Sequence, residues 1–228
     1  MATPYVLYYA PDNASLIVRL ALEELNVDYR SVLIDRRINA HLSDAYRKLN
    51  PAARIPTLET PDGPISETAA ILLWLADRHG HLLPSINHKL RGAALNWLFF
   101  ISNTIHAEMT ILFYSDRYAP NSAIPALRKA LKKRLNLHLE ILEKQASPRL
   151  SSWLGGEIPS ALDLYIAAII RWLQIYPTPD GIGLNLTKIP RLRDICYRLE
   201  SRPSVLAFCK AENIKQQPFT QPELPFTT

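Results

Sequence analysis

The stretch from Asn50 to Ile71 constrains the fold of this chain most strongly, because one short segment contains the start of a strand, a tight turn and the start of a helix. Pro56 cannot donate a backbone hydrogen bond, so Ile55-Pro56 is expected to open a strand over Thr57 to Thr60, at an edge or at its first residue. The peptide units of Ile55 are then left free to face a group other than the sheet.

Residues 61–75 continue this segment into a hairpin and a helix. Asp62-Gly63 predicts the hairpin, since glycine supplies the positive φ that a tight return needs. Residues 66–68, Ser-Glu-Thr, then precede a helix with an apolar face at Ile71, Leu72 and Leu75. The free amide groups and the positive dipole end of that helix attract a carboxylate. The segment therefore predicts an acceptor site for a ligand with peptide-like groups, a carboxylate and an ammonium group.

The joint pattern over residues 50–71 resembles the glutathione-binding half of the cytosolic glutathione transferases. That family's pattern is Asn-Pro, a spacer, an apolar residue with a cis-proline, Asp-Gly, and then Glu/Gln-Ser/Thr-x-Ala-Ile. The resemblance implies that Ile55, beside Pro56, pairs its backbone with the cysteinyl unit of glutathione. It also implies that Glu67 and Thr68 hold the γ-glutamyl end. Each residue alone is compatible with a plain hairpin and helix cap, so the joint occurrence carries the assignment.

The remainder of residues 1–82 predicts alternating strands and helices. Val6 to Tyr9 is a short β-rich run that ends in turn residues, and apolar residues at helical spacing follow up to about Asn26. Tyr29 to Ile34 is the next strand, and the connection is too long for a hairpin, so the two strands should be parallel. With a weak helix before the Asn50 segment, the order is βαβαββα. This order is that of a thioredoxin-like α/β domain.

Residues 89–228 predict an all-helical bundle domain with an extended tail, after a linker at residues 83–88. Apolar patterns of helical period run over residues 89–118 and 124–146, and these two long helices should pack along each other. Two further helical patterns precede the proline-containing tail.

Ser160-Ala-Leu-Asp163 is a variant of the capping box, and it precedes a nearly all-apolar segment. A helix that is apolar on every side is expected at the centre of the bundle. The same cap occurs at this place in glutathione transferases, so the resemblance extends from Tyr5 to about Ala211.

Composition and charge exclude several classes of function. The 228 residues contain no run of eighteen apolar residues and no signal-like N-terminus, so we expect no membrane association and a cytoplasmic location. Cys196 and Cys209 show no metal-ligand spacing and are expected to be idle thiols, with no metal bound. The net charge of +5 includes a basic stretch at residues 128–134. No aromatic residue interleaves it, so a solvated helix face is favoured over nucleic-acid binding.

The turn after the first strand, Tyr8 to Ser15, is where a group that stabilises a thiolate is expected. A free thiol has a pKa of about 8.5, and each unit of depression requires about 1.4 kcal/mol of preferential stabilisation of the anion. Aligned to the bacterial beta class, which has Tyr-x-Pro-Gly-Ala-Cys-Ser-Leu, the cysteine position is Ala14, and Ser15 is the best remaining donor. The alternatives are Tyr9, which matches the tyrosine of the alpha, mu and pi classes, and Asn13, near the serine of theta- and zeta-like enzymes.

The resemblance implies further ligand contacts from outside this turn. His106 falls where beta-class enzymes bring a second-domain histidine toward the ligand, although an isolated helix histidine also suits a structural role. Arg37, or its neighbour Arg36, is assigned to the glycyl carboxylate, against the alternative of solvated arginines. Aromatic residues that also suit a core are assigned to the pocket for the second substrate, namely Phe113, Tyr114, Tyr118 and Trp172.

By this resemblance we expect a glutathione transferase that activates bound glutathione, its co-substrate, as a thiolate for attack on small hydrophobic electrophiles. A homodimer and a role in detoxification are implied by the resemblance alone. One alternative is a glutathione-binding or interaction protein without turnover, motivated by Ala14 and by Asp12 in a usually glycine-rich turn. The other alternative function is a glutathione-dependent peroxidase, isomerase or dehalogenase on the same fold, since the fold does not determine the reaction.

Overall fold

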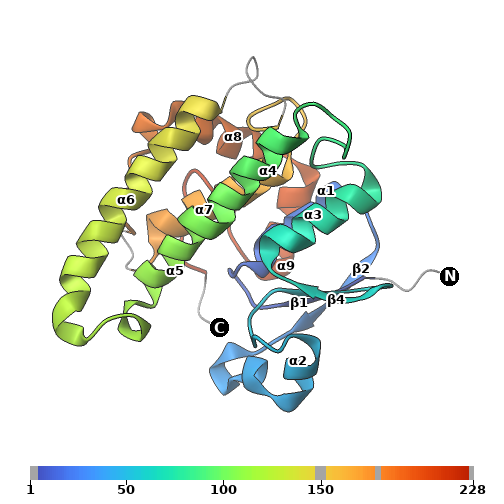
Figure 1. Ribbon diagram of the computed structural model, residues 1–228, viewed down its shortest axis with the longest axis horizontal. Coiled ribbons are helices and arrows are strands. Elements are labelled where there is room, and N and C mark those ends of the chain that lie inside the picture. Colours follow the sequence, from blue (N-terminus) through green and yellow to red (C-terminus); the bar gives the residue numbers. More distant parts are fainter. Residues whose placement is uncertain (1–4, 147–152, 178–180, 226–228) are drawn as a thin grey trace.

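The N-terminal part of the computed structural model is a four-stranded sheet with helices on both faces (Figure 1). The structure describes residues 5–146, 153–177 and 181–225. The strands are β1 (Tyr5–Tyr9), β2 (Tyr29–Leu33), β3 (Thr57–Thr60) and β4 (Gly63–Ser66). The α-helices are α1 (Ser15–Glu24), α2 (Asp44–Leu49) and α3 (Thr68–His79), and two 3-10 turns, η1 (Arg36–Ile38) and η2 (Ala40–Leu42), precede α2.

The strand order is β2-β1-β3-β4, with β1 parallel to β2 and antiparallel to β3. The parallel pair follows from the crossover through α1, and the antiparallel β3–β4 pair from the hairpin at Gly63, whose φ is 111°. This arrangement confirms the predicted thioredoxin-like order.

The C-terminal part of the chain is helical. Its α-helices are α4 (Arg91–Phe100), α5 (Ala107–Phe113), α6 (Ile124–Gln145), α7 (Ala161–Ile175), α8 (Pro190–Glu200) and α9 (Pro203–Glu212). The shorter segments are the π-helix η3 (Ile101–His106) and the 3-10 turns η4 (Ser115–Arg117), η5 (Asn121–Ala123) and η6 (Leu186–Lys188). The predicted long helix at residues 89–118 thus consists mainly of α4, η3 and α5, which run without a break over residues 91–113.

The helix α7 lies at the centre of this part, as its nearly all-apolar sequence predicts (Figure 1). The predicted capping box is present: the Ser160 hydroxyl accepts hydrogen bonds from the amides of Leu162 and Asp163, and the Asp163 carboxylate accepts one from the Ser160 amide. One charged residue of this helix, Arg171, is 0% exposed. Its partners are found in the turn before α1 and in the C-terminal tail.

The two parts share a continuous apolar core. Helix α1 packs against both α7 and α9, and the amide of Ala161 donates to the carbonyl of Leu82 at 2.8 Å. Residues 213–225 follow α9, and the Gln174 amide group donates to the carbonyl of Phe219 at 2.8 Å. The division of the chain at residues 83–88 stays a prediction.

Candidate functional site

The backbone at Ile55 is open to a ligand. The Ile55-Pro56 peptide bond is cis, and β3 begins directly after it. Among the described residues, neither the amide nor the carbonyl of Ile55 has a hydrogen-bond partner. Because buried backbone polar groups are nearly always paired, a half-buried residue with two free groups is a natural site for an extended peptide-like ligand.

Glu67 begins α3 in a strained backbone conformation. Its φ of 70° and ψ of 114° are rarely adopted by residues with a side chain, and such strain concentrates at ligand sites. The Glu67 side chain is exposed and forms no capping hydrogen bond, so the amides in the first turn of α3 stay available. Thr68, the next residue, is buried. The helix start therefore combines a carboxylate, a hydroxyl and free amides, and the assignment of Glu67 and Thr68 to the γ-glutamyl end stays a prediction.

The register of the sheet brings three predicted segments together. Tyr8 pairs with Thr57 in the antiparallel β1–β3 ladder, and Thr57 pairs with Ser66 in the β3–β4 ladder. In an antiparallel pair, the residues that follow one strand lie beside the residues that precede the other. The residues after Tyr8 therefore lie beside those before Thr57, and the residues before Thr57 also lie beside those after Ser66. The turn at residues 10–15, the open backbone of Ile55 and the N-terminus of α3 therefore meet at one end of the sheet.

The hydroxyl of Ser15 is already paired within the protein. Ser15 is 0% exposed, and its Oγ donates to the carbonyl of Ala10 at 3.0 Å and accepts from the amide of Ala10 at 3.2 Å. These two bonds close the turn between β1 and α1. A role for Ser15 as the thiol donor stays a prediction, and it requires the donor bond to Ala10 to break.

Asn13 and Tyr9 lie in different surroundings. The Oδ1 atom of Asn13 accepts from the amide of Ala14 at 2.8 Å, whereas no partner of its amide nitrogen is found in the described part of the chain. Tyr9 is partly buried, and the guanidinium carbon of Arg19 lies 4.6 Å from the centre of its ring. Asn13 therefore has side-chain N–H groups in the turn that are available to donate to a ligand.

His106 is connected to the N-terminus of α3 through a buried tyrosine. Its Nδ1 atom lies 2.8 Å from the hydroxyl of Tyr165 in α7, and the side chains of Ser102, Glu67 and Thr68 lie near enough to affect the pKa of that hydroxyl. Burial lowers the pKa of His106 to about 4 and raises the pKa of Tyr165, so both groups are neutral near pH 7. The predicted second-domain histidine and the predicted γ-glutamyl residues are therefore brought together. The role of Tyr165 could not be predicted from the sequence, because this residue lies within a nearly all-apolar pattern.

The two arginines after β2 have different partners. Arg37 is exposed, its Nη2 atom lies 2.9 Å from Oδ2 of Asp35, and this pairing lowers the pKa of the Asp35 carboxyl. Arg36 instead donates from Nη2 to the hydroxyl of Tyr114 at 2.9 Å. The structure thus joins Arg36 to a residue of the helical part, while Arg37 is held by its neighbour in the chain.

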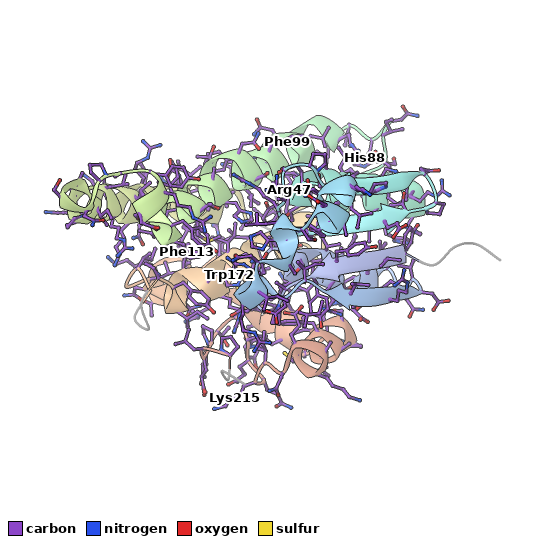
Figure 2. The ribbon with its side chains drawn as sticks, turned by 90° about the horizontal axis from the view of Figure 1, so that it is seen from below. Arg47, His88, Phe99, Phe113, Trp172 and Lys215 are labelled. Atoms are coloured by element: carbon purple, nitrogen blue, oxygen red, sulfur yellow. The ribbon has the colours of Figure 1, made fainter. Side chains whose placement is uncertain are left out.

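The four aromatic residues predicted for a second-substrate pocket differ in burial and in the rings that they contact. Trp172 is 3% exposed and its ring centre lies 6.1 Å from that of His106, and the ring centre of Phe113 lies 5.8 Å from that of Tyr176. Figure 2 labels Phe113 and Trp172 on the green and orange helices of the helical part. Tyr118 is 51% exposed. The assignment of these residues to a substrate pocket stays a prediction.

A buried aspartate also belongs to this region. The carboxylate of Asp12 accepts hydrogen bonds from Arg171, from the indole of Trp172 at 2.7 Å and from the hydroxyl of Tyr176 at 3.1 Å. Its amide donates to the carboxylate of Glu212 at 2.8 Å, and burial raises the pKa of that carboxyl. The sequence signal for these contacts is Asp12 itself, an acidic residue at the position of the turn where the beta-class pattern has glycine.

The described residues contain no group of three or more His, Cys, Asp and Glu side chains arranged to hold a metal ion. No helix in the described ranges is both long enough and apolar enough to cross a membrane. The polar groups that converge at the end of the sheet are instead neutral donors, free backbone groups and one exposed carboxylate. They are suited to a thiol-containing peptide with a free ammonium group.

Comparisons with known proteins agree with this chemistry. Residues 14–78 match the family described as "Glutathione S-transferase, N-terminal domain". The glutathione S-transferase GstA of Escherichia coli O157:H7 is 28% identical over 213 residues, covering 92% of this chain and 99% of that protein. The disulfide-bond oxidoreductase YfcG of Escherichia coli K12 is 28% identical over 205 residues, covering 87% of this chain and 91% of its own.

A solved structure extends the likeness to the whole fold. The glutathione S-transferase of a sphingomonad, complexed with glutathione, has a TM-score of 0.75 and 25% sequence identity, and the match covers 92% of this chain and 100% of that one. The similarity thus covers both the thioredoxin-like sheet and the helical part. Residues 14–78 therefore match the N-terminal domain of the glutathione S-transferases, and most of the chain is similar to members of that family.

Proposed function

We propose that this protein is a glutathione transferase that binds glutathione along Ile55, Glu67 and Thr68 and activates its thiol at the turn before α1. The observation that carries the proposal is the meeting of these groups at one end of the sheet, which the register of β1, β3 and β4 imposes. The sphingomonad relative, complexed with glutathione, supports the same ligand.

Asn13 is proposed as the group that stabilises the thiolate. Its free amide nitrogen can donate to the sulfur, whereas the Ser15 hydroxyl already donates to Ala10. A donor aimed at an anion stabilises the thiolate relative to the thiol and so lowers the thiol pKa. In the reaction the thiolate forms a C–S bond to the electrophile, the leaving group departs with its electron pair, and the thiol proton passes to solvent.

The test compares Asn13→Ala with Ser15→Ala, each in a conjugation assay with a chlorodinitrobenzene. A hydrogen bond to a charged group contributes about 1.5–3 kcal/mol, so Asn13→Ala should lower kcat about 10- to 100-fold. It should raise the pKa of bound glutathione, measured by thiolate absorbance, and leave glutathione affinity nearly unchanged. Asn136→Ala on α6, whose amide nitrogen donates to the carbonyl of Lys132, is the matched control.

Two results would assign the site differently. Full activity of Asn13→Ala, together with a slow Ser15→Ala or Tyr9→Phe, would move the donor role to Ser15 or Tyr9. Saturable glutathione binding with no conjugation across a panel of electrophiles would favour a binding protein.

A second candidate activity is the reduction of disulfides by glutathione, and the relative named as a disulfide-bond oxidoreductase favours it. Cys196 and Cys209 are both buried, so the electrons would come from two glutathione molecules. The first thiolate attacks the disulfide and releases a thiolate, and the second attacks the mixed disulfide to give glutathione disulfide. Turnover of a small dialkyl disulfide, followed by release of its thiol, tests this activity.

We further propose a cytoplasmic homodimer with the domain division at residues 83–88, on the strength of the family resemblance. Light scattering at several concentrations tests the dimer, for which a mass of twice 25.9 kDa is expected.

A further inference from the structure

Four basic side chains gather between the segment after β2 and the turn after α5. They are Arg36, His41, Arg47 and Arg117, here called the basic cluster. Arg36 donates to the hydroxyl of Tyr114, and the guanidinium carbons of Arg36 and Arg117 lie 5.9 Å and 4.4 Å from the ring centre of Tyr114. Tyr114 therefore lies against guanidinium groups from two parts of the chain.

The guanidinium groups of the basic cluster, on Arg36, Arg47 and Arg117, lack ion-pair partners in the part of the chain that the structure describes. The Nδ1 atom of His41 is buried without a hydrogen-bond partner in the same ranges. Burial, followed by the charges of Arg36, Arg117 and Arg47, lowers the pKa of His41. Like charges held together without a partner create a positive potential that an anion relieves.

The basic cluster lies at the edge of the proposed glutathione site. Strands β1 and β2 are parallel, with Tyr9 opposite Leu33, so the segment after β2 leaves the same end of the sheet as the turn that carries Asn13. Tyr114 directly follows Phe113, the last residue of α5. Figure 2 looks from below onto the end of the molecule that carries Arg47, with Phe113 on the green helix.

The amount of charge exceeds what glutathione needs here. Glutathione has one glycyl carboxylate, for which Arg37 is the assigned partner, and the basic cluster adds three further exposed guanidinium groups. Guanidinium groups bind carboxylates through two parallel hydrogen bonds and also stack on aromatic rings. A ligand with an aromatic ring and a carboxylate would satisfy both the cluster and the neighbouring aromatic side chains.

We propose that the electrophile used by this protein carries a carboxylate, which Arg36 and Arg117 bind while its ring packs beside Tyr114. This inference rests on the proposed function and replaces a purely hydrophobic second substrate by an anionic one. Arg117 belongs to the helical part and Arg36 to the sheet part, so a carboxylate between them would also draw the two parts together over the bound electrophile.

The experiment compares a chlorodinitrobenzoate with its methyl ester, with glutathione saturating. In both reactions the C–S bond forms, the C–Cl bond breaks and chloride leaves with the electron pair. After division by the uncatalysed rates, kcat/KM should be about tenfold or more higher for the acid, as expected for charge-assisted hydrogen bonds. Arg117→Gln should bring this ratio close to one without changing the KM for glutathione. Lys129→Gln, an exposed cation on α6, should leave the ratio unchanged.

Equal normalised kcat/KM values for the acid and the ester would overturn the proposal. So would an Arg117→Gln variant that keeps the preference, or one that raises the KM for glutathione to the same extent, since the cluster would then belong to glutathione. If neither compound reacts, the proposed function fails and a binding measurement decides the inference. Tighter binding of an unreactive aminodinitrobenzoate than of its ester, lost in Arg117→Gln, supports the anionic site, and equal binding overturns it.

Discussion

Asp12 and Arg171 form a buried, two-point ion pair across 159 positions of the chain. Nε and Nη2 of Arg171 donate to Oδ1 and Oδ2 of Asp12, each at 2.9 Å, and the two side chains are 2% or less exposed. Trp172 and Tyr176 donate to the same carboxylate. The turn that precedes α1 is thus attached to the central helix of the helical part.

We predict that Asp12→Asn destabilises the protein strongly, because it leaves the charge of Arg171 buried without a counter-charge. Removing one partner of a buried pair costs about 3–5 kcal/mol, whereas an exposed pair contributes about 0–1 kcal/mol. Urea unfolding should show the large loss for Asp12→Asn. Asp194→Asn, in the exposed pair with Arg198, is the matched control and should change the free energy of unfolding only slightly. Equal effects of the two changes would contradict the burial argument.

The capping box of α7 gives a second prediction. Ser160→Ala removes the acceptor for two amides and the donor to the carbonyl of Trp153 at 2.6 Å, and should cost about 1–2 kcal/mol in the free energy of unfolding. Ser43→Ala offers a comparison, since Ser43 caps the six-residue helix α2, where its hydroxyl accepts from Tyr46. A smaller loss is expected there because α2 is short and mostly exposed. A larger loss in Ser43→Ala would count against the central role of α7.

The lowered pKa of His106 predicts a pH dependence. The folded protein holds the ring neutral down to a pKa of about 4, whereas the unfolded chain protonates it near about 6.5. Stability from the neutral ring is therefore complete above pH 6.5 and is lost as the pH falls from about 6.5 to about 4.

His106→Gln isolates this effect, because the buried Asp163, whose pKa burial raises to about 6, is common to both proteins. Between pH 7 and pH 5 the parent should lose more stability than His106→Gln, as measured by urea unfolding. Parallel losses in the two proteins would show that His106 titrates normally.

Both cysteines are predicted to be unreactive in the folded protein. Burial raises the pKa of Cys196 and that of Cys209, the latter to about 11, so almost no thiolate is present near neutral pH. Ellman's reagent should label two thiols per chain in denaturant and none rapidly in native buffer. Fast labelling of either cysteine in the native protein would reopen a role for a protein thiol in disulfide reduction.

Local rules account for the elements that were predicted from the sequence. Pro56, the Asp62-Gly63 turn and the Ser160–Asp163 cap act through their own or nearby backbone groups, so the pattern of neighbouring residues suffices to place them. The parallel pairing of the first two strands followed from the length of the connection between them. The thioredoxin-like part and the helices could thus be predicted without knowledge of any long-range contact.

Contacts between distant residues could not be predicted in the same way. Ser15 was correctly placed at the start of a helix, but its hydroxyl faces Ala10 because of the course of the whole turn. Arg171 stands in an apolar pattern, and nothing near it in the sequence indicates a partner at Asp12. The basic cluster needs Arg117 and Arg36 to come together, which depends on how the helical part packs against the sheet.

The attachments of Arg171 have a consequence for the order of events during synthesis. Arg171 also donates to the carbonyls of Pro218 and Glu223, and Glu212 accepts from the amide of Asp12. A ribosome makes the turn at residue 12 first, yet it must add residues 212–223 before that turn gains all its partners. A nascent chain halted before that point would lack several partners of this turn, so we expect the proposed glutathione site to be completed late in translation.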